Sequence, residues 1–219
     1  MQALLNPVEA RVLGALVEKQ ITTPDYYPLT LNGLTTACNQ KSNRFPVVAF
    51  DEKTVVGAQE SLRDKELARM VSGADMRVPK YYHLFVEKFE LTPPQVAALC
   101  VLMLRGPQTT GEIRGRSSRL YEFADLGEVE QTLKALSERD RGAMTMQLER
   151  QPGRKEARYA HLLCGEPEAV AEEEGPVEPA ALELRADNER IAALEGEVIA
   201  LRDELAALQR AFEEFKGQF

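Results

Sequence analysis

The sequence predicts a mainly α-helical chain with small β-hairpins (α+β), in which one module occurs twice and a helical rod follows. Three observations lead to this prediction. Two similar helix starts occur along the 219 residues, a similar order of elements follows each start, and a heptad pattern runs near the C-terminal end. We therefore divide the chain into a first module (1–88), a second module (89–165), a linker (166–180) and a rod (181–219).

Each module begins with a strong helix-start signal. LNPVE, from Leu5, places Asn at the N-cap, Pro at the first helical position and Glu at the third, and LTPPQ, from Leu91, repeats this design with Thr, Pro and Gln. The apolar positions that follow are Val8, Val12, Leu13 and Leu16 in the first module and Val96, Leu99, Leu102 and Met103 in the second. This spacing predicts an amphipathic helix in both places.

The order of elements after these helices is the same in both modules. Apolar spacing and turn residues predict two further helices and then two short strands joined by a turn that contains Gly and Pro. The ranges are 28–34 and 107–113 for the second helices, 51–62 and 125–136 for the third helices, 69–71 and 144–148 for the first strands, and 81–85 and 159–163 for the second strands. Three helices and a hairpin in about 75 to 80 residues are typical of a winged helix, so the sequence predicts tandem winged-helix domains.

The net charge of −8 comes from the last part of the chain. Residues 1–165 carry 22 basic and 20 acidic side chains, whereas residues 166–219 carry 5 basic and 15 acidic ones. The two modules are therefore close to neutral by themselves. Overall acidity does not exclude the binding of a polyanion by the modules.

Two further absences in the sequence bear on where the protein acts. The chain contains neither an apolar run long enough to span a membrane nor the residue order of a signal peptide. Its three cysteines, Cys38, Cys100 and Cys164, form no CxxC pair. We expect a cytoplasmic protein without a membrane span, with the thiols packed as small hydrophobic groups.

The C-terminal part combines an acidic linker with a heptad pattern. Residues 166–180 (EPEAVAEEEGPVEPA) are rich in Glu, Pro and Ala, which is typical of a disordered linker. The heptad positions a and d hold Ile191, Leu194, Val198, Leu201, Leu205, Leu208, Phe212 and Phe215. β-branched residues at a with leucine at d favour two parallel strands, so we expect a homodimer through these residues. The alternative is a single amphipathic helix folded back on the modules.

Two long stretches carry a family resemblance. They are LNPVEARVLGALVEKQITTPDYYPLTLNGLTTACNQKSNRFPV, from Leu5 to Val47, and LRGPQTTGEIRGRSSRLYEFADLGEVEQTL, from Leu104 to Leu133. In these stretches the chain resembles the bacterial YceH-like proteins, whose known fold is a pair of winged-helix domains. The resemblance covers about residues 1–165 and leaves out the heptad segment. It implies a fold and no functional residue, because the activity of that family is not established.

The sequence contains no recognised catalytic or cofactor motif. It has no phosphate-binding loop, dinucleotide fingerprint, zinc-protease motif or nucleophile elbow. His83 and His161 fall at the same place in the repeat, which favours structural or surface roles over a metal ligand or a general base. We therefore expect no enzyme activity, no metal and no cofactor.

Tyr26 and Tyr27 lie in an extra loop of the first module. Exposed tyrosines suit a protein interface. The alternative is that these rings close the core beneath the loop.

Basic residues gather outside the predicted third helices. Each third helix, taken as 51–66 and 125–141, holds five acids and three bases, so neither attracts phosphate as a unit. Loops after the second helices and the second wing instead mix Arg and Lys with Asn and Ser, a combination that contacts phosphates. The candidate nucleic-acid-binding residues are Lys41, Asn43, Arg44, Arg114, Arg116, Ser117, Arg119, Arg154, Lys155 and Arg158. The alternative is that residues 114–119 form a solvated loop whose arginines pair with nearby acids.

Two functions remain open at this point. The first is a non-enzymatic, regulator-like DNA-binding protein, a dimer whose loops and second wing touch phosphates. The second is a protein-interaction or scaffold module that uses the winged-helix surfaces and the coiled coil. The acidic third helices favour the second function, and the repeated basic loops favour the first.

Overall fold

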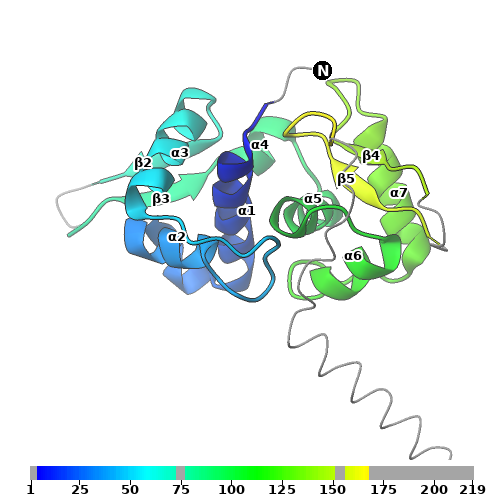
Figure 1. Cartoon of the computed structure of the whole chain (residues 1–219), viewed down its shortest axis with the longest axis horizontal. Helices are drawn as coiled ribbons and strands as arrows, with labels where there is room; N and C mark the ends of the chain where they lie inside the picture. Colours follow the sequence, from blue (N-terminus) through cyan, green and yellow to red (C-terminus); the bar gives the residue numbers. More distant parts are fainter. Residues whose placement is uncertain (1–3, 73–76, 151–155, 168–219) are drawn as a thin grey trace, which may run out of the picture. The chain divides into compact units, whose positions relative to one another are not determined.

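A computed structural model describes residues 4–72, 77–150 and 156–167 (Figure 1). These residues belong to one unit, which covers residues 1–171. About half of them are helical, and the strands form small antiparallel sheets, so the fold is mixed α and β. The rod (181–219), and with it every predicted dimer residue, lies outside the described residues, as does the linker from residue 168 onward.

The order of elements in the first module recurs in the second. The first module contains α1 (Pro7–Thr22), a short 3-10 helix η1 (Pro24–Tyr26), β1 (Leu29–Thr30), α2 (Leu31–Cys38), α3 (Glu52–Asp64), β2 (Ala68–Val71) and β3 (Lys80–His83), and the short helix α4 (Phe85–Phe89) crosses the predicted boundary between residues 88 and 89. The second contains α5 (Pro93–Arg105), α6 (Thr110–Ser117), α7 (Leu126–Ser137), β4 (Thr145–Gln147) and β5 (Tyr159–His161). The predicted helices and hairpins are therefore present, with boundaries that differ by a few residues.

Both predicted helix starts are confirmed. The Asn6 side chain accepts a hydrogen bond from the Glu9 backbone N–H at 2.9 Å, and the Asn6 backbone N–H donates to the Glu9 carboxylate at 2.8 Å. At α5, the Thr92 backbone N–H donates to the Gln95 side chain at 3.1 Å. These reciprocal bonds satisfy N–H groups that the first turn of a helix leaves without intrahelical partners.

The first module has a three-stranded antiparallel sheet with the order β1-β3-β2. Strand β1 was not predicted, because two residues show no alternation of apolar and polar positions. Leu29 is opposite Tyr81, and Thr30 is opposite Lys80. In the second module β4 pairs with β5, and a single bridge between Gln108 and Tyr159 occupies the place of β1.

The predicted strand at 81–85 is partly wrong. The strand ends at His83, and Phe85 begins the short helix α4. Phe85 is fully buried, and its ring packs edge-on against Phe89 with centroids 5.3 Å apart, a contact that the i, i+4 spacing of a helix makes. The sequence run alone does not show this change of period, because Phe85 is also a good strand former.

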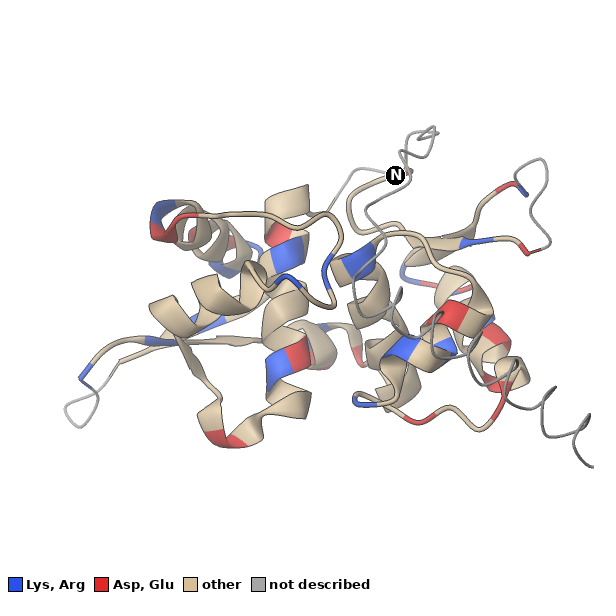
Figure 2. Ribbon diagram, turned by 60° about the horizontal axis from the view of Figure 1, so that its bottom comes forward, with Lys and Arg blue, Asp and Glu red and all other residues tan. Residues whose placement is uncertain are grey.

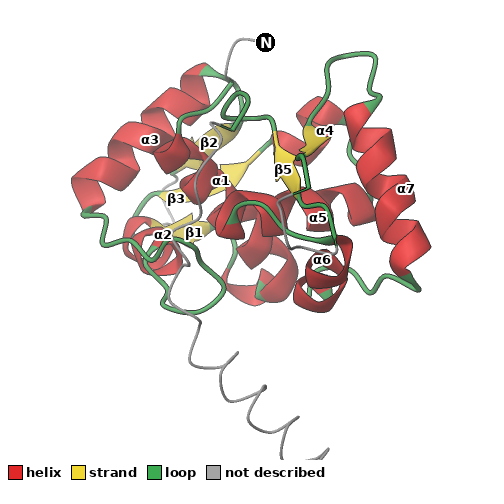
Figure 3. Ribbon diagram, turned by 45° about the vertical axis from the view of Figure 1, so that its right-hand side comes forward, coloured by secondary structure: helices red, strands yellow, loops and turns green. Residues whose placement is uncertain are grey.

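Helices α1 and α5 pack against each other in the middle of the described unit (Figure 3). All residues at 9–17 of α1 and at 96–104 of α5 are buried, so both helices are covered more widely than the predicted single stripes. The close approach depends on Gly14. A Cβ atom there would lie 3.0 Å from Leu104 Cδ2, which is tighter than ordinary van der Waals contact. The expected burial of Cys38 and Cys100 is confirmed.

Candidate nucleic-acid interface

The loop after α2 is held from inside by Arg44, which we had expected at the surface. The Arg44 side chain is buried, with the residue 1% exposed. Its guanidinium forms a two-pronged pair with the Glu18 carboxylate, at 2.6 and 3.0 Å, and Nε donates to the Ala37 carbonyl at 3.1 Å. Arg44 therefore anchors its loop to α1 and does not face solvent, so we leave it out of the interface.

The Glu18 carboxylate stays ionised although it is largely shielded from water. Burial by itself raises the pKa of Glu18, but the hydrogen bonds and positive charge of Arg44 outweigh that effect and the pKa of this carboxyl is lowered. Lys19, whose Nζ lies 3.5 Å from the Glu18 carboxylate, adds a second positive charge beside it.

A second buried arginine, Arg11 of α1, holds the same loop and was not singled out in the sequence. Its guanidinium donates to the Cys38 carbonyl at 3.1 Å and to the Pro46 carbonyl at 2.6 Å. No sequence signal marks this role, because Arg11 lies within a helix between apolar positions. With Arg44, it holds both ends of the segment that carries Lys41 and Asn43.

In the second module, the candidates Arg114 and Ser117 also make structural bonds. Arg114 is exposed, yet it donates to the Phe123 carbonyl at 3.3 Å and to the Ala124 carbonyl at 2.8 Å. The Ser117 hydroxyl is buried and donates to the Arg114 carbonyl at 3.1 Å. The two Arg114 bonds tie α6 to the segment that leads into α7, whereas the Ser117 bond lies within α6. Ser117 is therefore not accessible to a ligand.

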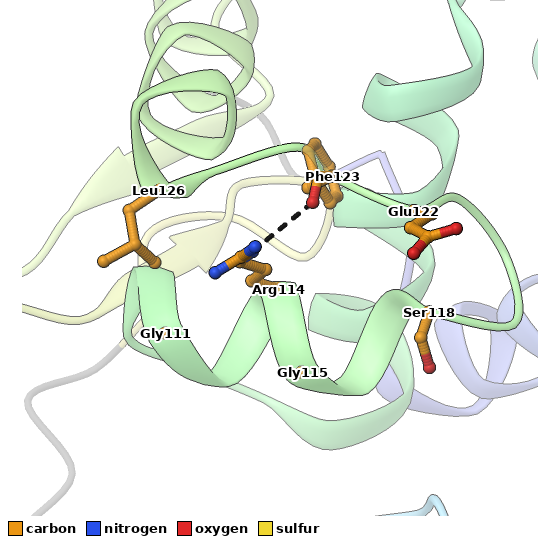
Figure 4. A pocket seen from close by; sticks show the side chains of 7 residues that line it. All are labelled: Gly111, Arg114, Gly115, Ser118, Glu122, Phe123 and Leu126. Carbon is orange, nitrogen blue, oxygen red and sulfur yellow. Dashed lines mark hydrogen bonds between the residues drawn. The ribbon is translucent and has the colours of Figure 1, made fainter.

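An open hollow of about 350 Å³ lies beside Arg114, between α6 and the start of α7 (Figure 4). It is lined by Gly111, Arg114, Gly115, Ser118, Glu122, Phe123 and Leu126. Two of these residues are glycines of α6, and a Cβ atom at Gly115 would meet nothing within 4 Å. The wall combines a cation, an acid and the 45% exposed Leu126, a mixture that suits a side chain of another protein.

Three arginines gather around the turn that follows α5, and we call Arg105, Arg116 and Arg158 the turn cluster. Arg105 begins the turn at 105–108, in which the backbone reverses at Gly106 with a φ of 72°. The Arg116 guanidinium donates to the Gln108 side chain, and Arg158 donates to the Pro107 carbonyl at 3.2 Å. The cluster therefore brings together α5, α6 and the second wing.

The loop of the first module reaches the turn cluster. The Arg105 guanidinium donates to the Asn43 side chain, and the Phe45 N–H donates to the Leu104 carbonyl at 2.9 Å. Asn43 has a φ of 59°, in the left-handed region that Asn tolerates better than most residues. Candidate residues of both modules thus converge on one turn. The sequence did not single out Arg105, because a base in the last turn of a helix is common.

The remaining candidates divide into two groups. Lys41 and Arg119 are exposed, as a contact with phosphate requires. Arg154 and Lys155 lie outside the described residues. Figure 2 shows basic and acidic positions intermixed along the described helices of both modules.

The two histidines and Tyr27 have structural roles in the packing of the modules. Burial lowers the pKa of both His83 and His161 to about 4, so their rings are neutral near pH 7. Tyr27 packs near the His83 ring, and its hydroxyl accepts a hydrogen bond from the His83 backbone N–H at 2.7 Å. Tyr27 thus closes the core beneath its loop, whereas Tyr26 is 78% exposed.

Two other features are absent from the described ranges. No group of three or more His, Cys, Asp or Glu side chains there is placed to hold a metal ion. No helix in the same part of the chain is both long and apolar enough to cross a membrane.

Comparison with known proteins gives one family. The model of a family described as "Protein of unknown function, DUF480" matches residues 5–154. A UPF0502 protein of Geobacter sulfurreducens is 55% identical over 221 residues, and one of Geobacter metallireducens is 56% identical over 220 residues. A UPF0502 protein of Pelobacter propionicus is 52% identical over 224 residues. In all three comparisons the match covers 100% of both chains.

Proposed function

The chain belongs to the DUF480 family of bacterial proteins, also called UPF0502, and we propose that it is a non-enzymatic DNA-binding protein, regulator-like in type, built from two winged-helix domains. The repeated order of elements supports this interpretation of the fold. So does the sheet order β1-β3-β2, in which the last two strands form the hairpin expected of a wing.

The observation that carries the DNA-binding proposal is the turn cluster. Arg116 and Arg158 bond to residues of one backbone turn that begins at Arg105, and the Arg116 guanidinium lies 3.5 Å from the Glu112 carboxylate. Arginine is the side chain best suited to phosphate oxygens, because its planar fork donates two parallel hydrogen bonds. Lys41 on the adjoining loop adds an exposed cation.

Such a surface binds mainly the backbone of the duplex. The third helices α3 and α7, which a winged helix commonly places in the major groove, carry more acid than base when their flanking residues are included. We therefore expect tolerance of sequence and a strong dependence on salt, since cations that bind phosphates release counterions from the duplex.

The test is a fluorescence-polarisation titration of a mixed-sequence duplex at several salt concentrations. Replacing Arg116 and Arg158 by Gln should weaken binding and reduce the slope of log K against log salt by about two. The control replaces Lys134 and Arg141 by Gln; these exposed bases lie in and just after α7 and are paired with acids. Absence of binding by the natural protein at low salt would refute the proposal.

We also propose that the heptad segment dimerises the protein. The support is the pattern of apolar a and d positions from Ile191 to Phe215. Placing Glu at Leu201 and Leu208 in the full chain should halve the mass measured by light scattering, because both are d positions. Placing Glu at Arg210, an outer position of the same heptad, should leave the mass of the dimer unchanged.

The alternative function, a protein-interaction or scaffold module, is favoured by the hollow on α6. Its exposed Leu126 at one end and Glu122 at the other suit a long partner side chain with an apolar stem and a basic end (Figure 4). A stoichiometric protein partner whose capture is lost on Leu126→Asp substitution would favour this function. Capture of nucleic acid alone would count against it.

A further inference from the structure

We propose that the solvent-facing side of the β1-β3-β2 sheet is a second phosphate-binding surface, in which Arg69 and Lys80 bind the nucleic-acid backbone and Tyr82 packs against it. This inference rests on the proposed function. It adds a contact region in the first wing, which the sequence did not indicate. Strand register places these side chains together, and the described part of the hairpin carries no acid beside them.

The register places the three side chains on one face. Arg69 is paired with Tyr82, and Val71 is paired with Lys80. Directly paired residues of antiparallel strands point to the same side, and so do residues two positions apart along a strand. Arg69, Lys80 and Tyr82 therefore share one face.

The opposite face belongs to the core. Ala68 and His83, which are paired with each other, are both buried. The next pair on that face, Met70 and Tyr81, lies further along the hairpin, where Met70 is 48% exposed. Because the inner face packs against the module, the face with Arg69 and Lys80 points to solvent.

The cations of this face have no acidic partner among the described residues. Arg69 is exposed and Lys80 half-buried, and neither forms an ion pair within those ranges. Arg77, also exposed, precedes β3 and adds a third base to the hairpin. In Figure 2 the described part of this hairpin, on the left, carries basic positions and no acidic ones. The contrast with α3 is direct, because Arg63 there lies 3.7 Å from Asp64.

The arrangement fits a nucleic-acid backbone. Lys80 lies diagonally across the strand pair from Arg69, at a separation of about 7 to 8 Å between diagonal positions, so the two cations can bind different phosphates. Tyr82 lies beside Arg69 and supplies a hydroxyl donor and a flat apolar ring, which suit a phosphate and a sugar respectively. A projecting hairpin carries these groups away from the acidic residues of the helices.

The test compares two double variants of the full-length protein with equal loss of charge. R69Q/K80Q removes the cations of the wing, and K53Q/R63Q removes two exposed cations of α3. Duplex titrations across a salt series measure the affinity and the slope of log K against log salt. Thermal unfolding of both variants checks that the fold is kept.

The wing variant should reduce the salt slope by about two and weaken binding at least tenfold at moderate salt, while the α3 variant stays near the natural protein. Tyr82→Phe should lose less affinity than Tyr82→Ala, because the ring is kept. Equal losses in both double variants would overturn the inference, since net charge alone would then explain them. Binding that R69Q/K80Q leaves unchanged would overturn the inference and leave the proposed function standing, whereas no binding by the natural protein would refute both.

Discussion

The two modules share an order of elements but hold the segment between their second and third helices in opposite ways. In the first module, Arg44 points inward from this segment and bonds to Glu18 and to a backbone carbonyl. Arg11 of α1 bonds to two further carbonyls from the buried side. In the second, the exposed Arg114 bonds to two carbonyls from the surface. Basic residues at equivalent places in a repeat therefore need not do equivalent work, and burial decides which of them a ligand can reach.

The largest expected effect is the loss of stability when the buried Arg44 is replaced, which we compare with replacement of the exposed Arg114. Arg44→Ala removes the two-pronged partner of the half-buried Glu18 carboxylate and leaves it only Lys19 at 3.5 Å, so we expect a loss of about 3 kcal/mol in the free energy of unfolding. Urea unfolding at neutral pH measures it. Glu18→Gln with Arg44→Leu, which removes both charges, should recover part of the loss. A loss below about 1 kcal/mol for Arg44→Ala would show that the two anchors are equivalent after all.

Lowering the pH tests whether the two histidines at matching positions of the repeat affect stability equally. Burial lowers the pKa of His83 and His161 to about 4 from the ordinary histidine value of 6.5, so the unfolded chain binds these protons first as the pH falls. Their contribution to stability is complete above about pH 6.5 and is lost progressively toward pH 4. At pH 5, protonation of each histidine in the unfolded chain should lower the free energy of unfolding by about 2 kcal/mol. Urea unfolding of His83→Leu and of His161→Leu at pH 7 and pH 5 measures this loss. Each substitution should remove an equal part of the loss of stability between the two pH values.

Two helical glycines offer a further contrast. Gly14→Val in α1 forces a side chain against Leu104 of α5, and we expect a loss of about 1 to 3 kcal/mol. Gly115→Ala in α6 meets open space and should raise stability by about 0.5 to 1 kcal/mol, because alanine restricts the unfolded chain. Thermal unfolding of both variants gives the comparison, and a stabilised Gly14→Val protein would contradict the close packing of α1 on α5.

The smallest effect is expected for the surface anchor. Arg114→Ala removes hydrogen bonds that water can replace at an exposed site, so the loss of stability should be below about 1 kcal/mol. Urea unfolding beside Arg44→Ala under the same conditions measures the difference. A loss as large as that of Arg44→Ala would mean that exposure does not govern the strength of these anchors.

Much of the fold was predictable because its signals are local. Asn6 and Thr92 start helices through bonds to residues three positions on, and both starts are confirmed. The family resemblance, carried by two long stretches, is confirmed by the DUF480 match at residues 5–154. Strand β1 and helix α4 were missed, since a two-residue strand has no period and Phe85 suits either structure.

The candidate site was less predictable, because its residues depend on distant partners. Lys41 and Arg119 are exposed as expected, whereas Arg44 and Ser117 are buried. Arg105, Arg69 and Lys80 were not singled out, since each looks ordinary in its own helix or strand. They stand out only when a turn gathers arginines around it or when the register of a sheet puts two cations on one face.

By itself the sequence determined the repeat, the helix starts, the hairpins and the placement of the net negative charge at the C-terminal end, because propensity, capping and composition act over a few residues. Only the tertiary structure decided which basic side chains face solvent. Arg44 and Arg69 are the same residue type, yet the first bonds to Glu18, 26 positions away in the chain, and the second is exposed. That choice depends on contacts between distant segments, since burial is a property of the packed chain and not of its local pattern.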